Sequence, residues 1–400
     1  MQRRITILGA TGSIGTQALD IVRANPNEFK VIGLSAGGSN VALLAQFALE
    51  FKVEVVAIAN GTAAQDFQLA IYAQASKQGY AEGSFEVPRL LIGPNAASEL
   101  AAVSVDVLLN GITGAVGLGP TVAALKAGTK LALANKESLV IGGKAVTRLA
   151  KPDQIIPVDS EHSAIAQCLR SGSKNEINKL ILTASGGPFR GYTKEQLEDV
   201  SIEQALAHPT WTMGPVVTIN SSTMMNKGLE VIEAHLLFEI PMDRIDVVIH
   251  PQSIVHSMVE FIDGSTIAQA SPPDMHLPIA LGLTWPDRIA NSSTPCDWTA
   301  QANWTFEPVD HKVFPAISLA KQAGLTAGTA PAVLNGANEV AVGAFLAGEL
   351  KYSQIIPTVS QIVEMHLASD FVSDDRLTIE EVVRAADWAQ SACTTLISNT

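Results

Sequence analysis

The first 160 residues alternate short apolar runs with amphipathic stretches, and this alternation constrains the fold more than any other feature of the sequence. The apolar runs lie at residues 4–8, 30–35, 53–59, 89–92, 105–110, 130–134 and 154–158. Helical patterns lie between them, for instance at residues 15–23 and 137–150. Strands that alternate with helices of this length predict an α/β region built on a doubly wound, mostly parallel sheet.

The pattern changes after about residue 175. Runs at residues 177–183, 216–220, 246–250 and 255–261 predict strands with fewer helices between them, which is typical of an α+β region. Residues 287–307 have little periodicity and predict a linker. The remaining chain predicts consecutive helices of a small bundle at residues 314–323, 330–348, 352–368 and 378–391.

Length and composition narrow the class of protein. A chain of 400 residues exceeds what one hydrophobic core usually organises, so two or three domains are expected. No run approaches the roughly 18 apolar residues of a membrane span, and the first predicted strand leaves no room for a signal peptide. Three well-separated cysteines, Cys168, Cys296 and Cys393, indicate neither a disulfide framework nor a zinc cluster. A cytoplasmic protein is expected.

The net charge argues against two kinds of partner. The chain carries 39 acidic and 26 basic residues, a formal charge of −13. Such a field repels nucleic acid and anionic membranes, so neither is expected as a partner. An anionic substrate would have to be held by a local site instead.

A glycine-rich segment, GATGSIG at residues 9–15, lies between the first predicted strand and the first predicted helix. In that context glycines allow a tight turn, and the helix N-terminus faces the pyrophosphate of a dinucleotide. The spacing departs from G-x-G-x-x-G because Thr11 holds the second glycine position. A merely structural turn is therefore the alternative to dinucleotide binding.

The end of the second predicted strand favours NADP over NAD. NAD enzymes usually carry an acid there that accepts a hydrogen bond from the ribose 2′-hydroxyl, but SAGGSN at residues 35–40 contains none. Ser39 and Asn40 could donate to a 2′-phosphate, although no basic residue accompanies them. Asn135, Lys136 and Glu137 follow a later strand and form either a second cofactor element or a capped helix start.

Two acidic segments predict a metal site. Asp159 and Glu161 flank Ser160 at a strand end, where two carboxylates can converge, and oxygen-only ligation suits Mg²⁺ or Mn²⁺. The alternative is a helix start at which acids favour the dipole. A third carboxylate is expected from Glu230, which would share a helix face with Asn226 and Lys227. A solvated surface stripe is the alternative for these three.

Further segments are candidates for holding an anionic substrate. The segment SST at residues 221–223 is expected to open the helix that carries Glu230, and SGGP at residues 185–188 follows a predicted strand. The segment HPTWTMGP at residues 208–215 is a poor structural connector and predicts a lid that closes over a substrate. Glu233, His235 and His256 have no evident partner and are expected to be structural.

The order of these motifs resembles that of the 1-deoxy-D-xylulose 5-phosphate reductoisomerases. The resemblance covers residues 4 to about 386 and is most specific over residues 135–285. It rests on GATGSIG at 9–15, NKES at 135–138, PVDSEH at 157–162, ASGGPF at 184–189, HPTW at 208–211, MMNKGLE at 224–230 and HPQS at 250–253. This sequence departs from the family in carrying Ala10 where many members have Ser, and in lacking the basic residue that some members carry near Asn40.

The resemblance implies three domains: an NADPH-binding Rossmann-like domain (1–159), a catalytic and dimerising α+β domain (160–286), and, after a linker (287–311), a helical bundle (312–400). The residues implied to contact NADPH are Thr11, Gly12, Ser13, Ile14, Gly38, Asn40, Asn135, Glu137 and Gly214. Mg²⁺, Mn²⁺ or Co²⁺ would be held by Asp159, Glu161 and Glu230. The implied substrate contacts are Lys136, Ser160, Ser185, His208, Ser221, Asn226 and Lys227, with Trp211 and Met213 closing the lid.

The implied activity is the NADPH- and metal-dependent isomerisation and reduction of the ketose 1-deoxy-D-xylulose 5-phosphate to 2-C-methyl-D-erythritol 4-phosphate, in the non-mevalonate isoprenoid pathway. Its skeleton would rearrange by a retro-aldol/aldol route or by ketol migration. The alternatives are another NADP-dependent enzyme such as a semialdehyde dehydrogenase, or a non-catalytic NADP sensor. A semialdehyde dehydrogenase needs a nucleophilic Cys in a loop, and none of the three cysteines is suitably placed.

Overall fold

The structure, a computed structural model, describes residues 2–81 and 84–399 and divides into two compact units. The first unit comprises Met1–Asn135, Leu149–Asp159 and Met275–Ser292. The second comprises Lys136–Arg148, Ser160–Asp274 and Ser293–Thr400. The chain crosses between the units several times: residues 136–148 belong to the second unit, and residues 275–292 belong to the first. The expected α+β region up to Asp274 and the helical region both lie in the second unit, and a division into three domains stays a prediction.

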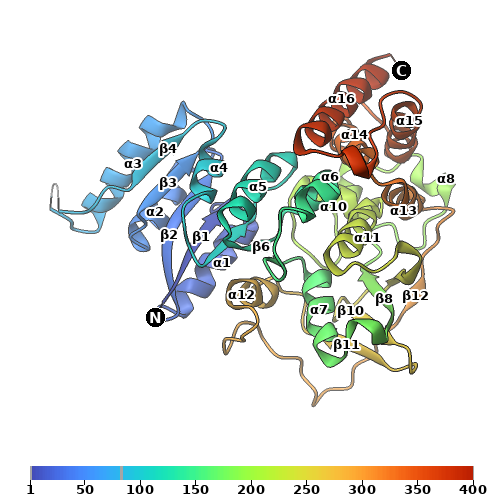
Figure 1. The fold of residues 1–400 in the computed structure, drawn as a ribbon, viewed down its shortest axis with the longest axis horizontal. Coiled ribbons are helices and arrows are strands. Elements are labelled where there is room, and N and C mark those ends of the chain that lie inside the picture. Colours follow the sequence, from blue (N-terminus) through green and yellow to red (C-terminus); the bar gives the residue numbers. More distant parts are fainter. Residues whose placement is uncertain (1, 82–83, 400) are drawn as a thin grey trace. The chain divides into compact units, whose positions relative to one another are not determined.

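The first unit is built on a parallel seven-stranded sheet with the strand order β4-β3-β2-β1-β5-β6-β7 (Figure 1), which confirms the predicted fold class. Its strands are β1 (Arg3–Leu8), β2 (Phe29–Ala36), β3 (Val55–Ile58), β4 (Arg89–Ile92), β5 (Val107–Asn110), β6 (Lys130–Leu133) and β7 (Ile155–Pro157). Its helices are α1 (Ser13–Ala24), α2 (Val41–Glu50), α3 (Ala63–Lys77), α4 (Ala96–Ala101), α5 (Leu118–Ala127) and α12 (His276–Thr284).

The apolar strands of this sheet are covered by helices on both faces. Right-handed crossovers place α1, α2 and α3 on one face and α4 and α5 on the other. A single core joins the first three helices and α12 to the strands. On the opposite face α4 approaches so closely that a Cβ on Gly33 would lie 2.6 Å from Leu100 Cδ1. Burial on both faces explains why the strands have no polar alternation.

The turn between β1 and α1 lies where the strand order reverses, the usual position of a ligand in such sheets. Gly9 has φ +76°, and the Gly12 N–H donates to the Gly9 carbonyl at 3.0 Å. A Cβ on Gly15 would lie 2.3 Å from the Gly9 carbonyl oxygen. Gly15 is thus required for the helix to pack on the turn, and the turn places the start of α1 at the carboxyl edge of the sheet.

The second unit contains a mixed five-stranded sheet with the order β11-β10-β8-β9-β12. The strands are β8 (Ile177–Ala184), β9 (Ile245–Ile249), β10 (Val255–Phe261), β11 (Thr266–Ala270) and β12 (Glu307–Pro308). Two helices, α7 (Ser160–Cys168) and α11 (Met225–Phe238), share one apolar core with this sheet. Glu161 lies in the first turn of α7, directly after Asp159, and Glu230 lies in the second turn of α11.

Helices surround the other side of α11. They are α6 (Lys136–Thr147), α8 (Lys194–Leu197), α9 (Ile202–Leu206), α10 (Pro215–Ser222), α13 (Ala316–Thr326), α14 (Ala330–Leu346), α15 (Ile355–Leu367) and α16 (Ile379–Ser398). The largest core of the chain joins α11 to these helices. A Cβ on Gly228 would lie 2.7 Å from Ala320 Cβ, so glycine permits the close packing of α11 on α13. The predicted terminal helices are confirmed.

Two local predictions are wrong. Residues 216–220 form part of helix α10 and not a strand. Their β-branched sequence favours a strand, but Gly214 at the N-cap and Pro215 at the first position start a helix that packs on α11 and α14. Ser221 and Ser222 consequently end α10, and the next helix begins at Met225 instead of opening at the serines.

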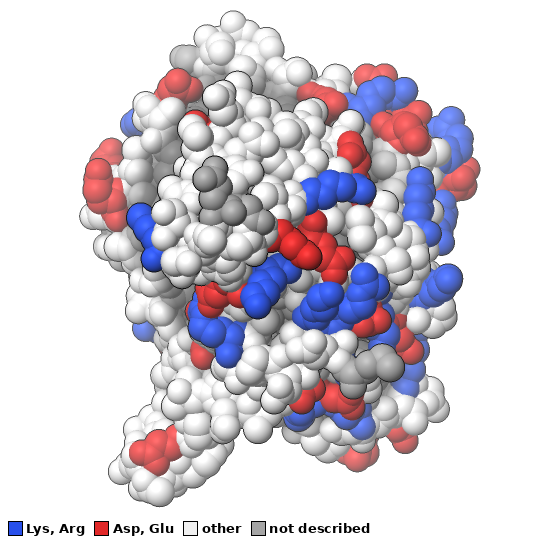
Figure 2. Space-filling view, turned by 90° about the vertical axis from the view of Figure 1, so that its left-hand side faces the viewer, with Lys and Arg blue, Asp and Glu red and all other residues white. Residues whose placement is uncertain are grey.

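On the face shown in Figure 2, acidic and basic side chains of the described residues lie next to one another. Arg23 illustrates the pattern, because its guanidinium contacts Glu50 at 2.6 Å and Asp20 at 2.5 Å. Among the described helices, none is both long and apolar enough to cross a membrane.

The glycine turn can be tested by substitution. Gly15→Ala should destabilise the chain by about 1–3 kcal/mol, because its Cβ would overlap the Gly9 carbonyl and force the turn to move. Gly37→Ala is the matched control, since a Cβ there meets nothing within 4 Å. Urea unfolding measures both, and equal free energies of unfolding for the two variants would contradict this account of the turn.

Candidate active site

The predicted acidic and amide residues of α7 and α11 converge within the second unit. Lys227 Nζ lies 2.6 Å from Glu161 Oε1 and 2.5 Å from Glu230 Oε2. Asn226 donates to Glu230 Oε1 at 2.5 Å, so all three predicted residues of α11 share one face. Ser160 donates to Glu161 Oε2 at 2.6 Å. These residues, joined by Lys136, are called the carboxylate–lysine cluster below.

Lys136, at the start of α6, completes the cluster. Its Nζ lies 2.8 Å from Asn226 Oδ1 and 3.2 Å from Glu230 Oε1. Packing of α6 on α11 within the second unit brings the two segments together although about 90 residues separate them in sequence. The solvated-stripe alternative for Asn226, Lys227 and Glu230 is therefore wrong.

Burial makes the charges of this cluster strongly dependent on one another. The side chains of Lys227 and Glu230 are 4% and 1% exposed. Burial alone would lower the pKa of the Lys227 ammonium, but the Glu161 and Glu230 carboxylates outweigh that effect and raise it. Lys227 therefore stays positively charged, and each carboxylate has a cation beside it.

A buried histidine fixes α7 against α11. His162 Nε2 donates to the Glu230 backbone carbonyl at 2.9 Å, and its Nδ1 lies 3.1 Å from Glu233 Oε2. Both side chains are almost completely buried. This contact sets the position of Glu161 relative to Glu230. Glu161 directly precedes His162, and Glu230 accepts the hydrogen bond through its own backbone carbonyl. Glu233, expected to lack a partner, therefore has one.

Asp159, covalently joined to the first residue of α7, supplies the third carboxylate. Ligand atoms of Asp159, Glu161 and Glu230 all lie within 4.8 Å of one another. A second group, Asp159 with His162 and Glu233, meets the same limit. The first group offers only oxygen atoms, which fits a hard divalent cation such as Mg²⁺. The His162 ring in the second group already bonds to the Glu230 carbonyl and lies beside Glu233.

Two predicted anion-binding segments adjoin each other. Gly187 has φ +65°, and a Cβ there would lie 2.9 Å from the Ser221 carbonyl oxygen. The turn after β8 therefore rests on the last turn of α10. Ser185 Oγ lies 2.9 Å from His208 Nε2 and accepts from the Gly187 N–H at 3.2 Å.

The tautomer of His208 follows from its partners. Its Nδ1 accepts from the backbone N–H groups of Thr210 at 3.1 Å and Trp211 at 2.9 Å. In the neutral ring the proton is then on Nε2, which donates to Ser185 Oγ. Because Ser185 Oγ accepts two hydrogen bonds, its own O–H is oriented away from both donors and can donate to an anion.

The segment predicted as a lid lies between α9 and α10. Trp211 is half-buried, and its ring lies edge-on to that of His256, with centroids 6.2 Å apart. His256, expected to be merely structural, also bonds through Nε2 to the Ser271 carbonyl at 3.1 Å. His235 likewise has a partner, the Ile240 carbonyl at 2.8 Å. Met213 is half-buried, and Gly214 is exposed at the N-cap of α10.

The predicted nucleotide residues of the first unit lie at the carboxyl edge of the parallel sheet. Thr11, Gly12, Ser13 and Ile14 are at least partly exposed in the turn after β1. Gly38 has φ +109°, which identifies it, and not Gly37, as the position that needs glycine. Asn40 caps α2 through its side-chain oxygen, which accepts from the Leu43 N–H at 3.1 Å. Its amide NH₂ is the group that could donate to a phosphate.

Asn135 holds a neighbouring loop in place at the carboxyl edge of the parallel sheet. Its buried amide donates to the carbonyls of Ile112 at 2.8 Å and Gly114 at 3.0 Å. Glu137, its other predicted partner in cofactor binding, is half-buried in the first turn of α6 in the second unit. The tight turn and the exposed start of α1 fit a dinucleotide pyrophosphate.

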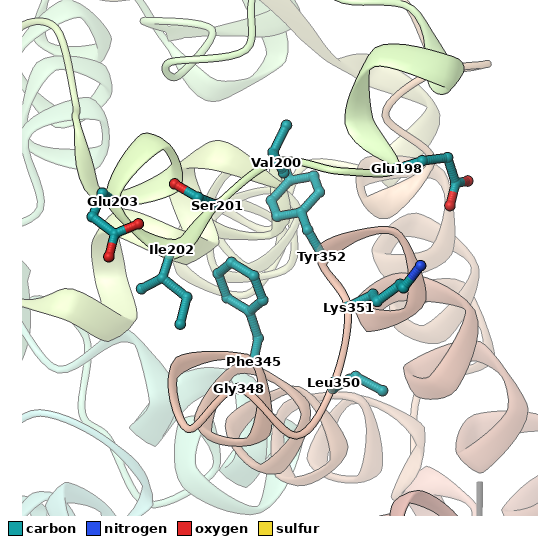
Figure 3. Close-up of a pocket in the computed structure, with 10 residues that line it drawn as sticks. All are labelled: Glu198, Val200, Ser201, Ile202, Glu203, Phe345, Gly348, Leu350, Lys351 and Tyr352. Carbon is teal, nitrogen blue, oxygen red and sulfur yellow. The ribbon is translucent and has the colours of Figure 1, made fainter.

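A cavity of about 340 Å³ lies elsewhere in the second unit (Figure 3). It lies between residues 198–203 and the end of α14, with Tyr352, Phe345, Val200 and Ile202 among its walls. The Tyr352 ring also contacts Phe189 edge-on, with centroids 5.0 Å apart. Because Phe189 directly follows Pro188 of the predicted anion-binding turn, this wall supports that turn from behind.

Parallel sheets with a glycine turn at the point where the strand order reverses are dinucleotide-binding folds. Combined with an oxygen-rich cluster of acids, this fold fits a metal- and dinucleotide-dependent enzyme. Comparison with known proteins makes the assignment specific. A model of 1-deoxy-D-xylulose 5-phosphate reductoisomerase matches residues 5–143, and two models of its C-terminal domains match residues 155–238 and 270–392.

Individual relatives cover almost the whole chain. The 1-deoxy-D-xylulose 5-phosphate reductoisomerase of Paenarthrobacter aurescens is 57% identical over 389 residues, which are 97% of this chain and 96% of the relative. That of Kitasatospora griseola is 55% identical over 97% of this chain and 98% of the relative. This chain belongs to the 1-deoxy-D-xylulose 5-phosphate reductoisomerase family.

Solved structures of reductoisomerases are similar to this chain over its full length. The reductoisomerase of Zymomonas mobilis in complex with NADPH aligns over 100% of both chains, with a TM-score of 0.89 and 36% identity. A reductoisomerase in complex with NADPH, fosmidomycin and magnesium aligns over 100% of this chain and 98% of that chain, with a TM-score of 0.88 and 36% identity.

The His208 contacts predict a pH dependence. Burial lowers the pKa of His208 from its usual 6.5, so the folded form favours the neutral ring. Protonation of Nδ1 would break both bonds to the backbone N–H groups, and this loss begins only as pH falls below about 6.5. The KM for a phosphorylated substrate should therefore be constant above neutrality and rise in acid.

A phosphate group also titrates near pH 6, so a control is needed. In His208→Asn the side-chain oxygen can still accept backbone N–H bonds but does not titrate. The variant should show a shallower rise of KM in acid than the parent chain. Superimposable KM profiles of the two proteins between pH 5 and 8 would rule out this role for His208.

Proposed function

We propose that this chain catalyses the NADPH- and divalent-metal-dependent isomerisation and reduction of 1-deoxy-D-xylulose 5-phosphate to 2-C-methyl-D-erythritol 4-phosphate, a step of the non-mevalonate isoprenoid pathway. The observation that carries the proposal is the carboxylate–lysine cluster, which supplies oxygen ligands and cations side by side. Identity of 57% over nearly the full length of a relative with that name supports it.

The metal ion would be Mg²⁺ or Mn²⁺, with Co²⁺ also possible, held by Asp159, Glu161 and Glu230. When bound it would stabilise oxyanion character on the ketone and neighbouring hydroxyl of the substrate while the carbon skeleton rearranges. Ser160 orients Glu161 by donating to its second oxygen. The contact of His162 with the Glu230 carbonyl keeps the two helices in position.

The substrate phosphate would be held by Ser185, Ser221, Asn226 and Lys227, with His208 orienting the Ser185 hydroxyl. Lys136, beside Asn226, would contact the substrate hydroxyl groups or skeleton. These residues are neutral donors and ammonium groups, and a bound divalent ion would add positive charge beside the Glu161 and Glu230 carboxylates that pair with Lys227. That arrangement supports an anionic, phosphorylated substrate.

The reduction step requires a hydride donor, and NADPH would supply it from the first unit. Thr11, Gly12, Ser13 and Ile14 form the pyrophosphate turn, and Gly38 and Asn40 lie at the end of β2. Asn135, Glu137 and Gly214 are the remaining proposed contacts. Because no acid follows β2, the chain should have a higher kcat/KM with NADPH than with NADH. Equal values for the two cofactors would contradict the proposed binding of the 2′-phosphate by the residues after β2.

A homodimer in the cytoplasm is proposed for the assembled enzyme. Strand β11 forms one edge of the five-stranded sheet, and Ile267 on it is 37% exposed. Ile262, on the turn before β11, is 68% exposed. An apolar sheet edge of this kind favours pairing with a second copy. Light scattering after size exclusion should give twice the chain mass, and a monomer mass would contradict the dimer.

Glu230→Gln tests the catalytic proposal. The substitution removes a buried charge of the cluster but keeps the shape, so NADPH oxidation driven by the ketose phosphate with Mn²⁺ should fall by at least about a thousandfold. NADPH binding, measured by fluorescence titration, should be nearly unchanged. Turnover that persists in this variant, or parent turnover that does not need a divalent metal, would refute the assignment.

The segment 208–215 is proposed to close over bound substrate. Because Trp211 is already half-buried, covering it would remove only roughly half of the 150–250 Å² that an aromatic side chain can bury, which is worth about 2–3 kcal/mol and is partly offset by ordering the loop. Trp211→Ala should therefore raise KM and slow turnover with little change in Tm. Trp298→Ala is the control, because Trp298 is 73% exposed. A large fall in Tm for Trp211→Ala alone would mean that Trp211 is simply a core residue.

A further inference from the structure

Lys227 occupies the same two carboxylates that the proposed metal site needs. Its ammonium nitrogen lies 2.6 Å from Glu161 Oε1 and 2.5 Å from Glu230 Oε2. Lys136 adds a second ammonium 3.2 Å from the other oxygen of Glu230. Glu230 thus has a cation at each of its oxygen atoms, in a place where its side chain is 1% exposed.

Two cations cannot share these oxygen atoms without cost. At a buried site an ammonium and a divalent ion a few ångströms apart repel each other far more strongly than in water. A carboxylate oxygen 2.5 Å from an ammonium also has part of its coordination direction filled. The Lys227 ammonium in this position therefore opposes metal binding by Glu161 and Glu230.

We propose that Lys227 competes with the divalent metal ion for Glu161 and Glu230, and that the phosphorylated substrate relieves this competition by drawing the ammonium to its phosphate. The inference rests on the proposed function. Lys227 is suited to the exchange because its flexible stem carries a compact charge with three rotatable donors. Asn226, one residue away, and Ser185 and Ser221 are the other proposed phosphate contacts.

The consequence is a coupling between metal and substrate binding. A substrate that draws Lys227 away raises the affinity for the metal, and by linkage the metal raises the affinity for the substrate by the same factor. The substrate-free protein would hold the metal weakly. Lys227 would then act as a positioning residue for the metal as well as a contact for the phosphate.

Removal of the ammonium tests the competition directly. The affinity for Mn²⁺ alone is measured by electron paramagnetic resonance of free Mn²⁺ at pH 8, on the full chain without NADPH. Lys227→Met should bind Mn²⁺ about tenfold more tightly than the parent chain, because the repelling charge is gone. Lys227→Arg, which keeps the charge, should bind Mn²⁺ as weakly as the parent.

The matched control is Lys179→Met. Lys179 also lies beside two carboxylates, 3.0 Å from Asp246 Oδ2 and 3.8 Å from Glu260 Oε2, but on the surface of the sheet. The control changes the net charge equally and should leave the Mn²⁺ affinity unaltered. If Lys227→Met does not fold, as judged by its thermal transition, Lys227→Gln replaces it.

The coupling between metal binding and substrate binding can be measured separately. Saturating 1-deoxy-D-xylulose 5-phosphate, without NADPH, should tighten Mn²⁺ binding by the parent chain by about tenfold and that by Lys227→Met much less. Unchanged or weaker Mn²⁺ binding by Lys227→Met would overturn the competition. A failure of the proposed function gives a different result, because the parent and Glu230→Gln would then bind Mn²⁺ equally.

Discussion

The contact between α7 and α11 is the constraint on which the site of the second unit depends. Carboxylates and ammonium groups are costly to remove from water, and such a cluster is tolerated only when each charge has a partner in good geometry. Here Glu230 and Lys227 are nearly completely buried, and their partners come from three separate segments. Removing one partner from a buried pair of this kind commonly costs about 3–5 kcal/mol.

Apolar packing around α11 offsets the free-energy cost of burying these charged side chains. Helix α11 lies in contact with two apolar cores, one shared with the five-stranded sheet and α7, the other with the terminal helices. Gly228 allows α13 to approach, and the His162 side chain joins α7 to the backbone of α11. Lys227 and Glu230 therefore lie on one face of a helix whose apolar residues pack into two cores. The chemistry of the site depends on this rigidity, because the carboxylates are useful only at set distances.

Much of this arrangement was predictable from the sequence, because it depends on local patterns. The strand–helix alternation predicted the parallel sheet, and helical spacing placed Asn226, Lys227 and Glu230 on one face. The helix at residues 215–222 was not predictable, because its β-branched sequence favours a strand and only packing decides otherwise. Short edge strands β11 and β12 lacked a clear pattern of their own.

Contacts between residues that are far apart in the sequence were the other feature that the sequence did not predict. Nothing near Lys136 in sequence indicates that it meets Asn226, or that residues 275–292 join the first unit. Glu233 could have been found by its spacing, since it lies three residues after Glu230 on the same helix, but its partner His162 lies about 70 residues earlier. Such contacts follow from how helices pack, which a single sequence does not specify.

The position of the metal ion is the most direct test of the central claim. Crystals grown with Mn²⁺ and the ketose phosphate, measured at the manganese absorption edge, would locate the ion by its anomalous scattering. The account predicts one peak in contact with carboxylate oxygens of Asp159, Glu161 and Glu230, with Lys227 moved away from both glutamates. A peak between His162 and Glu233, or Lys227 still bridging Glu161 and Glu230 beside a bound ion, would contradict it.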